Sequence, residues 1–288
     1  MQRIRLRYTK RGRLRFTSHR DFQRAFERAL RRAEVPMAYS AGFTPHPKVS
    51  YANAAPTGTG SEAEYLEIAL TEARDPDKLR DLLDESMPVG LDIIEAVEAR
   101  TSGLADRLTA SVWELRLDGV DPAEAERAVE AFKAADVVEV QRKTKNGMRT
   151  FDARAAVASL EASSGSSTAA SSEASSEASS ETSSETNSPQ ADRSSDQACA
   201  ILRLVVRHVT PAVRPDDVLS GLRAVADLAP PVAAAVTRLA QGLFDEETGT
   251  VTDPLAPDRE AVMAVPPSHE EAVAASAAAK APVPEGPA

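Results

Sequence analysis

Residues 1–36 read MQRIRLRYTKRGRLRFTSHRDFQRAFERALRRAEVP, and they set how the fold begins. Within them Ile4, Leu6 and Tyr8 alternate with arginines, as expected of a strand with one buried face. A turn follows, and residues 14–16 are predicted to resume the strand. The chain is therefore expected to open on a strand whose second face carries positive charge.

The second half of this stretch predicts an amphipathic helix. Ser18 stands three residues before Asp21, which gives the helix a start that resembles a capping box. Pro36 is expected to end it, because a proline disfavours helical backbone in the residue before it. The apolar residues recur at helical spacing on one side: Phe22, Ala25, Phe26, Ala29, Leu30 and Ala33.

The pattern continues as β-α-β-β-α-β, which is the order of a ferredoxin-like unit. Strands are predicted near 37–41, 48–54, 63–71 and 91–97, and a helix over 76–87. A second unit is predicted from a strand at 110–118, a helix at 122–135, a hairpin at 137–142 and 148–151, a short helix at 152–162, a strand at 199–209 and a helix at 215–228. The predicted fold class is α+β with two ferredoxin-like units.

Two segments lack the apolar side chains that a core needs. Residues 163–197 contain 15 serines and no Val, Ile, Leu, Met, Cys or aromatic residue. Ordering them would cost backbone entropy with nothing to offset it. We therefore expect four regions: a first unit at 1–100 with a basic first helix, a second unit at 108–162 plus 198–244, a disordered Ser/Glu-rich insert at 163–197, and a disordered Ala/Pro-rich tail at 245–288.

Charge is distributed unevenly along the chain, whose net charge is −10. Residues 1–50 hold 13 Lys or Arg against 3 Asp or Glu, a local charge of +10, and the remainder sums to −20. Eight of the twelve aromatic residues lie within residues 1–65. Because basic and aromatic residues coincide, the sequence favours an anionic partner in spite of its acidic average.

The first helix carries much of this positive charge. Its arginines follow spacings of four and three, which place them together on the face opposite the apolar residues: Arg20, Arg24, Arg28 and Arg31. The acidic residues of the helix are too few to balance them. Phosphate binding is therefore predicted, with RNA as the expected ligand. A solvated helix face would give the same pattern.

Residues 39–51 read YSAGFTPHPKVSY and are the least generic stretch of the chain. Two prolines hold His46 in a rigid loop, and a glycine permits a turn that other residues would strain to make. The loop supplies four candidate binding residues: Tyr39, Phe43, His46 and Lys48. They are predicted to contact an anion or a nucleotide, although a structural turn with His46 capping a carbonyl fits equally well.

An alternative prediction is catalytic. If the N-terminus of the first helix faces the loop, His19 lies near His46 and the two can act as acid and base on RNA. A metal site from His19, Asp21 and His46 is conceivable, but these residue types more often satisfy caps and turns. No metal is therefore predicted. Cys199 is flanked by apolar residues and is expected to be a buried structural thiol.

Two stretches resemble the signatures of the radical SAM-linked protein family: residues 13–21 (RLRFTSHRD) and 39–48 (YSAGFTPHPK). Residues 62–68, 143–147 and 213–219 are similar to later stretches of that family. The family is a domain of unknown function, fused in some bacteria to the C-terminus of a B12-binding radical SAM protein and encoded separately in others. The insert and the tail depart from its usual pattern.

The resemblance implies that the chain works with a radical SAM enzyme. Such an enzyme holds its iron–sulfur cluster with three cysteines and this chain has one, so the cluster and S-adenosylmethionine would belong to the partner. We therefore expect a non-catalytic accessory that binds RNA or presents a substrate and has no cofactor of its own. The alternatives are a stand-alone RNA-processing enzyme and a protein–protein adaptor.

The expected location is the cytoplasm. No apolar run reaches the length of a membrane-spanning helix, and residues 1–7 lack the apolar core of a secretory signal. A membrane partner is therefore not predicted.

Overall fold

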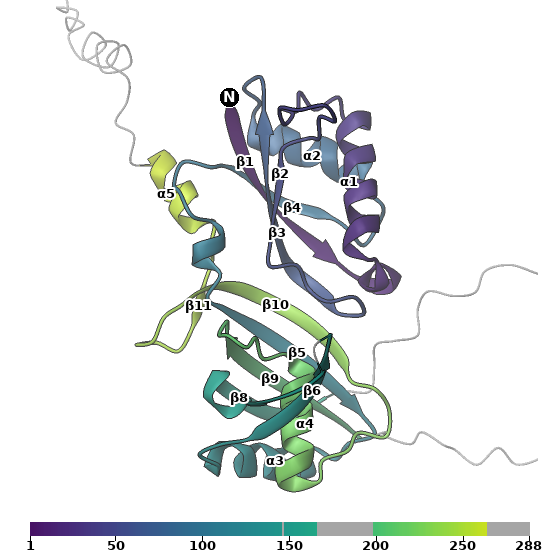
Figure 1. Cartoon of the computed structure of the whole chain (residues 1–288), viewed down its shortest axis with the longest axis vertical. Coiled ribbons are helices and arrows are strands. Elements are labelled where there is room, and N and C mark those ends of the chain that lie inside the picture. Colours follow the sequence, from purple (N-terminus) through teal and green to yellow (C-terminus); the bar gives the residue numbers. More distant parts are fainter. Residues whose placement is uncertain (146, 166–197, 264–288) are drawn as a thin grey trace, which may run out of the picture.

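The computed structural model describes residues 1–145, 147–165 and 198–263. These residues form one large, mostly antiparallel sheet, a separate two-stranded sheet and five α-helices. The predicted α+β class is therefore confirmed. Figure 1 shows two halves that follow one another along the long axis of the molecule.

The first half is a sheet with two helices on one face. Its elements are β1 (Gln2–Lys10), α1 (His19–Arg32), β2 (Val49–Ala52), β3 (Gly60–Leu70), α2 (Pro76–Ser86) and β4 (Ile93–Glu98). The strands lie in the order β4-β1-β3-β2, and each neighbouring pair is antiparallel. Ile4, Leu6 and Phe26 are fully buried in the core between this sheet and its helices. The alternation in β1 therefore marks the buried face correctly.

The second half repeats a sheet with two helices and adds a hairpin. Its elements are β5 (Ala110–Asp118), α3 (Pro122–Ala134), β6 (Glu139–Thr144), β7 (Gly147–Asp152), β8 (Val157–Ser164), β9 (Cys199–Arg207), α4 (Pro215–Ala226) and β10 (Ala235–Phe244). The main strands lie in the order β10-β5-β9-β8, again with antiparallel neighbours. β6 and β7 pair only with each other. Phe132 and Leu222 bring α3 and α4 into one core with this sheet.

One short parallel pairing joins the two halves. Gly60 and Ser61 at the start of β3 pair with Thr237 and Arg238 of β10. Because both strands belong to the large sheet, the sheet runs through both halves without interruption. Among the described residues, no helix combines the length and apolar character needed to cross a membrane.

Part of the expected tail is folded. β11 (Val251–Thr252) pairs with β10, and α5 (Ala256–Met263) lies on the face of the first sheet away from α1 (Figure 1). Leu255 and Asp258 are both fully buried, which explains why this segment is ordered although it has few large apolar residues. The expectation of disorder from residue 245 is therefore wrong for 245–263, and residues 264–288 lie outside the described part.

Three predicted elements are wrong. Residues 14–16 belong to a 3-10 helix, Gly12–Phe16, and residues 37–41 make only isolated bridges. Most of the predicted helix at 152–162 is the strand β8, because pairing with β9 outweighs the helical preference of its alanines. This strand runs to Ser164, so it includes the first residues of the expected insert. Residues 166–197 of the insert lie outside the described residues.

Candidate functional site

The orientation of α1 follows from its buried face. Ser18 caps the helix, and its hydroxyl accepts a hydrogen bond from the Asp21 backbone N–H at 3.2 Å. Phe22 is buried and stacks on Tyr8 of β1, with ring centroids 4.4 Å apart. Because this face is fixed against the sheet, the arginines on the opposite face of α1 point away from the protein.

We call these four side chains, Arg20, Arg24, Arg28 and Arg31, the arginine ridge. All four are exposed. Only Arg24 forms an ion pair, a 3.9 Å contact with Asp21, and the other three have no side-chain partner among the described residues. At 1.5 Å per residue the ridge is about 16 Å long. Each like-charge pair at this spacing costs about 0.2–0.5 kcal/mol, a cost that a bound anion would remove.

Residues 39–48, here named the His46 loop, lie beyond the C-terminal end of α1. Two hydrogen bonds close the loop: the Ser40 N–H donates to the His46 carbonyl at 2.8 Å, and the His46 N–H donates to the Ser40 hydroxyl at 3.0 Å. Gly42 has φ of +133°, a backbone conformation that favours glycine. Phe43 follows it and is fully exposed. The loop therefore has a fixed base and presents its tip to solvent.

A hollow of about 420 Å³ lies between α1 and the His46 loop. Arg31, Tyr39 and His46 line it, so the structure brings three of the predicted binding residues together. Glu27 and Glu34 line it as well. Because two carboxylates face one guanidinium there, the hollow suits a group that donates hydrogen bonds better than it suits a phosphate.

His46 also borders a second hollow of about 410 Å³, which Lys48 and Arg3 line. Arg3 is 3.3 Å from the Glu67 carboxylate, whereas the Lys48 ammonium has no partner among the described residues. His46 therefore stands between two adjoining hollows. Lys48 provides the unpaired positive charge of the second one.

Exposed aromatic side chains lie in the chain segments before and after α1. Among the described residues only Phe16, Tyr39 and Phe43 are strongly exposed aromatics. Phe16 lies just before α1 and the other two just after it, and the Arg15 guanidinium stacks 4.6 Å from the centre of the Phe16 ring. Such rings expose flat apolar surfaces that can stack on unpaired bases.

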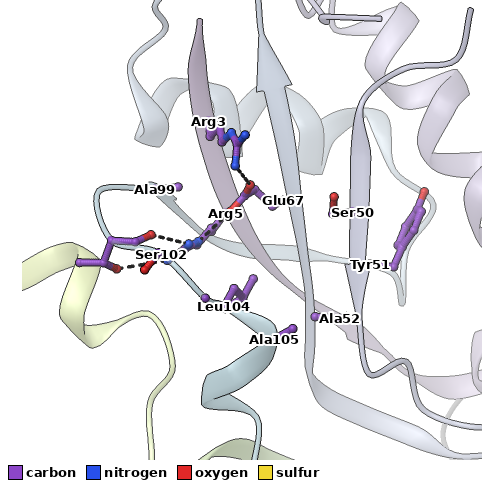
Figure 2. Close-up of a pocket in the computed structure, with 12 residues that line it drawn as sticks. Arg3, Arg5, Ser50, Tyr51, Ala52, Glu67, Ala99, Ser102, Leu104 and Ala105 are labelled. Atoms are coloured by element: carbon purple, nitrogen blue, oxygen red, sulfur yellow. Dashed lines mark hydrogen bonds and ion pairs between the residues drawn. The ribbon is translucent and has the colours of Figure 1, made fainter. Parts of the chain in front are cut away.

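The arginines of β1 do not add free charge to this surface. Figure 2 shows Arg3 and Arg5 pointing to Glu67 in a third hollow, of about 320 Å³, on the sheet face opposite α1. Arg5 is 2% exposed and also pairs with Asp258 of α5. Arg7 donates to a backbone carbonyl. The sequence predicts positive charge on the second face of this strand, but Glu67 and Asp258 balance the charges of Arg3 and Arg5 there.

The Asp258 carboxylate already accepts hydrogen bonds from donors on that face, including Arg5 and Thr101, which line the third hollow. Its carboxylate accepts hydrogen bonds from the Thr101 N–H at 2.9 Å and the Thr101 hydroxyl at 2.6 Å, and it also contacts Arg107 at 3.1 Å. Burial acts to raise the pKa of Asp258, but the hydrogen bonds from Thr101 and Arg5 outweigh burial and hold that pKa below its ordinary value. The third hollow is therefore not an open phosphate site.

A His19–His46 pair requires the His46 loop to face the N-terminus of α1, and the structure does not place the loop there. His19 lies at the start of α1 and contacts the edge of Tyr51, with ring centroids 4.8 Å apart. His46 lines a hollow with Arg31 and Glu34 near the C-terminal end of α1. Arg31 is twelve residues from His19, which corresponds to about 18 Å along the helix axis. The His46 loop thus faces the C-terminal half of α1 and not its N-terminus. Within the described ranges, no group of three or more His, Cys, Asp or Glu is placed to hold a metal ion.

The structure contains two buried polar clusters that no sequence pattern predicts. At the junction of the halves, Arg238 pairs with Glu64, and both side chains are 2% exposed. In the second half, Ser111 lies 2.8 Å from His208 Nε2, and burial lowers the pKa of His208. Neither cluster has a local sequence signal, because its members are far apart in the chain. Ser111 is fully buried and so has no access to a substrate. The predicted burial of Cys199 is confirmed.

A family model described as an uncharacterized protein conserved in bacteria (DUF2344) matches residues 3–215. This match covers well over half of the chain, and the chain therefore belongs to the DUF2344 family. The matched residues include the arginine ridge and the His46 loop. The description does not mention a radical SAM enzyme, so that partnership stays a prediction. No curated protein matches the chain.

Proposed function

We propose that this member of the DUF2344 family binds single-stranded RNA across the arginine ridge and the His46 loop. The observation that carries the proposal is a line of exposed arginines, three of them without a side-chain partner among the described residues, with exposed aromatic residues in the chain segments before and after α1. A solvated helix face explains the arginines alone. It does not explain why the strongly exposed aromatics of the described part all lie in the segments on either side of α1 in the sequence.

The surface divides into parts with different chemistry. The arginine ridge would contact phosphates, because guanidinium groups match phosphate oxygens in charge and geometry. Phe16 and Phe43 would stack on bases. The hollow between α1 and the His46 loop would take a base edge, whose amino groups can donate to Glu27 and Glu34. Such a surface favours single strands, whose bases are accessible.

We propose in addition that the protein is a non-catalytic accessory of a radical SAM enzyme. Support comes from the resemblance of residues 13–21 and 39–48 to the radical SAM-linked family, and these residues border or form the surface described above. Purification from the native cell tests it: a radical SAM enzyme should co-purify before and after ribonuclease treatment. Recovery of RNA without any such enzyme would leave RNA binding in place and remove the partnership.

We also infer that each half is a ferredoxin-like unit. The strand orders β4-β1-β3-β2 and β10-β5-β9-β8 support this inference, because each puts the first and third strands of a β-α-β-β-α-β unit at the centre. In the second half the β6–β7 hairpin would then be an addition to the unit. An experimental structure with a different strand order would contradict the inference.

Direct binding tests the RNA proposal. Fluorescence anisotropy with a labelled single-stranded RNA of about 12 nucleotides, a length within the range of single-strand binding sites, would measure affinity at low salt. Arg24→Glu together with Arg28→Glu should abolish measurable binding, because two attractive contacts become repulsive.

The matched control is Arg127→Glu together with Arg223→Glu. These are exposed helical arginines on α3 and α4, and the double substitution changes the net charge by the same amount. The control should bind RNA as the unchanged protein does. Equal loss in both variants would show that only net charge matters and would contradict a specific surface.

A further inference from the structure

The β6–β7 hairpin is the one described element whose strands pair outside the large sheet. Its base is firmly attached, since Val140 and Phe151 are buried in the core of the second half. Arg142 adds to this anchor: it contacts Asp217 at 2.6 Å and stacks on Phe151. All described residues from 143 to 150 are exposed. The hairpin is therefore fixed at its base and extends into solvent at its turn.

The exposed end, named here the hairpin tip, comprises residues 143–145 and 147–149. It carries Lys143, Lys145 and Arg149, and residues 140–151 contain no acidic residue. None of the three cations has a side-chain partner among the described residues. Their positive charges therefore do not stabilise the fold through ion pairs with the described residues.

The register of the hairpin adds a cost. Arg149 lies directly opposite Arg142. Like charges in this cross-strand position destabilise a hairpin. Arg142 is neutralised by Asp217, whereas Arg149 has no such contact among the described residues. An external anion at the hairpin tip would relieve this repulsion.

We propose that the hairpin tip is a second RNA-binding surface, which contacts the phosphate backbone of a strand that also occupies the arginine ridge. This inference rests on the proposed function and extends it to the second half. The tip carries cations on both faces of a narrow, projecting arm, because Lys143 lies opposite Met148 on one face and Arg149 lies opposite Arg142 on the other. Such an arm can contact successive phosphates of a nucleic-acid backbone. Met148 is exposed beside them and offers an apolar contact to a base. In Figure 1, β6 ends on the side of the second half that faces the first.

Length dependence of binding provides the first test. Lys143→Gln, Lys145→Gln and Arg149→Gln together should lower affinity about tenfold for an RNA of about 30 nucleotides, while leaving the affinity for an RNA of about 6 nucleotides unchanged. Arg127→Gln, Arg203→Gln and Arg223→Gln form the charge-matched control in the same half and should leave both affinities unchanged. Equal affinity of the tip variant and the unchanged protein for the long RNA would overturn the inference.

Lysine footprinting provides a second test that separates the two surfaces. Acetylation of the full chain, read by mass spectrometry, should show that the long RNA protects Lys143, Lys145 and Lys48 but not Lys78 or Lys133. Protection of Lys48 alone would overturn the hairpin inference and keep the proposed function. Protection of Lys143 and Lys145 alone would show that RNA contacts the hairpin tip without the His46 loop, which would contradict both the proposed function and the inference that one strand occupies both surfaces. If the RNA protects none of these lysines, both the proposed function and the hairpin inference are contradicted. Equal protection of the same lysines by polyglutamate would overturn the assignment of the ligand as RNA.

Discussion

Replacing Glu64 by glutamine should destabilise the protein strongly, although the two side chains have nearly the same shape. Glu64 lies at the junction of the two halves, where it pairs with Arg238 and accepts a hydrogen bond from the Ala55 N–H at 3.0 Å. Glutamine keeps the size and one acceptor oxygen but removes the charge. The guanidinium of Arg238 would then remain buried without an anion.

The expected loss is about 3–5 kcal/mol in the free energy of unfolding, the usual cost of removing one partner of a buried ion pair. The remaining partners of Arg238 are weak: Gln241 accepts at 3.3 Å and Ser61 at 3.5 Å. Lys10 increases the loss. Burial lowers the pKa of Lys10 and Glu64 acts against this, so the substitution also removes a charge that stabilises the Lys10 ammonium.

Urea unfolding followed by fluorescence would measure the loss. Trp113 is the single tryptophan of the chain and lies 5.4 Å from the Arg238 guanidinium, so its emission reports on this junction. Arg238→Met should cost a similar amount. The double variant should cost no more than Glu64→Gln alone, because the buried guanidinium that Glu64→Gln leaves without an anion is then absent. A loss below about 1 kcal/mol for Glu64→Gln, or additive losses in the double variant, would refute this reasoning.

Three further predictions follow from individual contacts. The pKa of Asp258 is held below its unfolded value of about 3.9, so the Asp258 carboxylate stabilises the fold above that pH, and this stabilisation is lost as the pH falls through the folded pKa. The difference in unfolding free energy between the unchanged protein and Asp258→Asn, measured by urea unfolding, should therefore shrink in acid. Burial lowers the pKa of His208, so stability should fall as the pH drops below about 6.5, and His208→Gln should remove that part of the pH profile. Tyr39→Ala and Phe43→Ala should each weaken RNA binding by about 1–3 kcal/mol per lost stacking contact without moving the unfolding midpoint, and unchanged affinity in anisotropy would exclude stacking.

Patterns within a single element are the part of the fold that the sequence predicts well. The spacing of Phe22 and Phe26 places the buried face of α1, and the alternation in β1 places its core face. Residues 152–162 show the limit of this approach. Their alanines favour a helix, but pairing with β9, which follows in the sequence only after a long insert, makes most of them a strand.

The candidate site was predictable in part for the same reason. The arginine ridge lies on one helix and the His46 loop follows it directly, so their exposure and proximity depend on short-range sequence. The state of Arg5 does not: its charge is cancelled by Asp258, which lies 253 residues further along the chain. The condition for a His19–His46 pair failed because it depends on which end of α1 the loop faces, and no local pattern encodes that choice.

The salt dependence of RNA binding tests the central claim most directly. For single strands, log affinity falls against log salt concentration with a slope of about −0.7 per phosphate contact. Arg20→Gln, Arg28→Gln and Arg31→Gln together should reduce the magnitude of that slope by about 2, whereas the Arg127, Arg203 and Arg223 control should retain the original slope. The same slope in the ridge variant and the unchanged protein would contradict RNA binding through the arginine ridge.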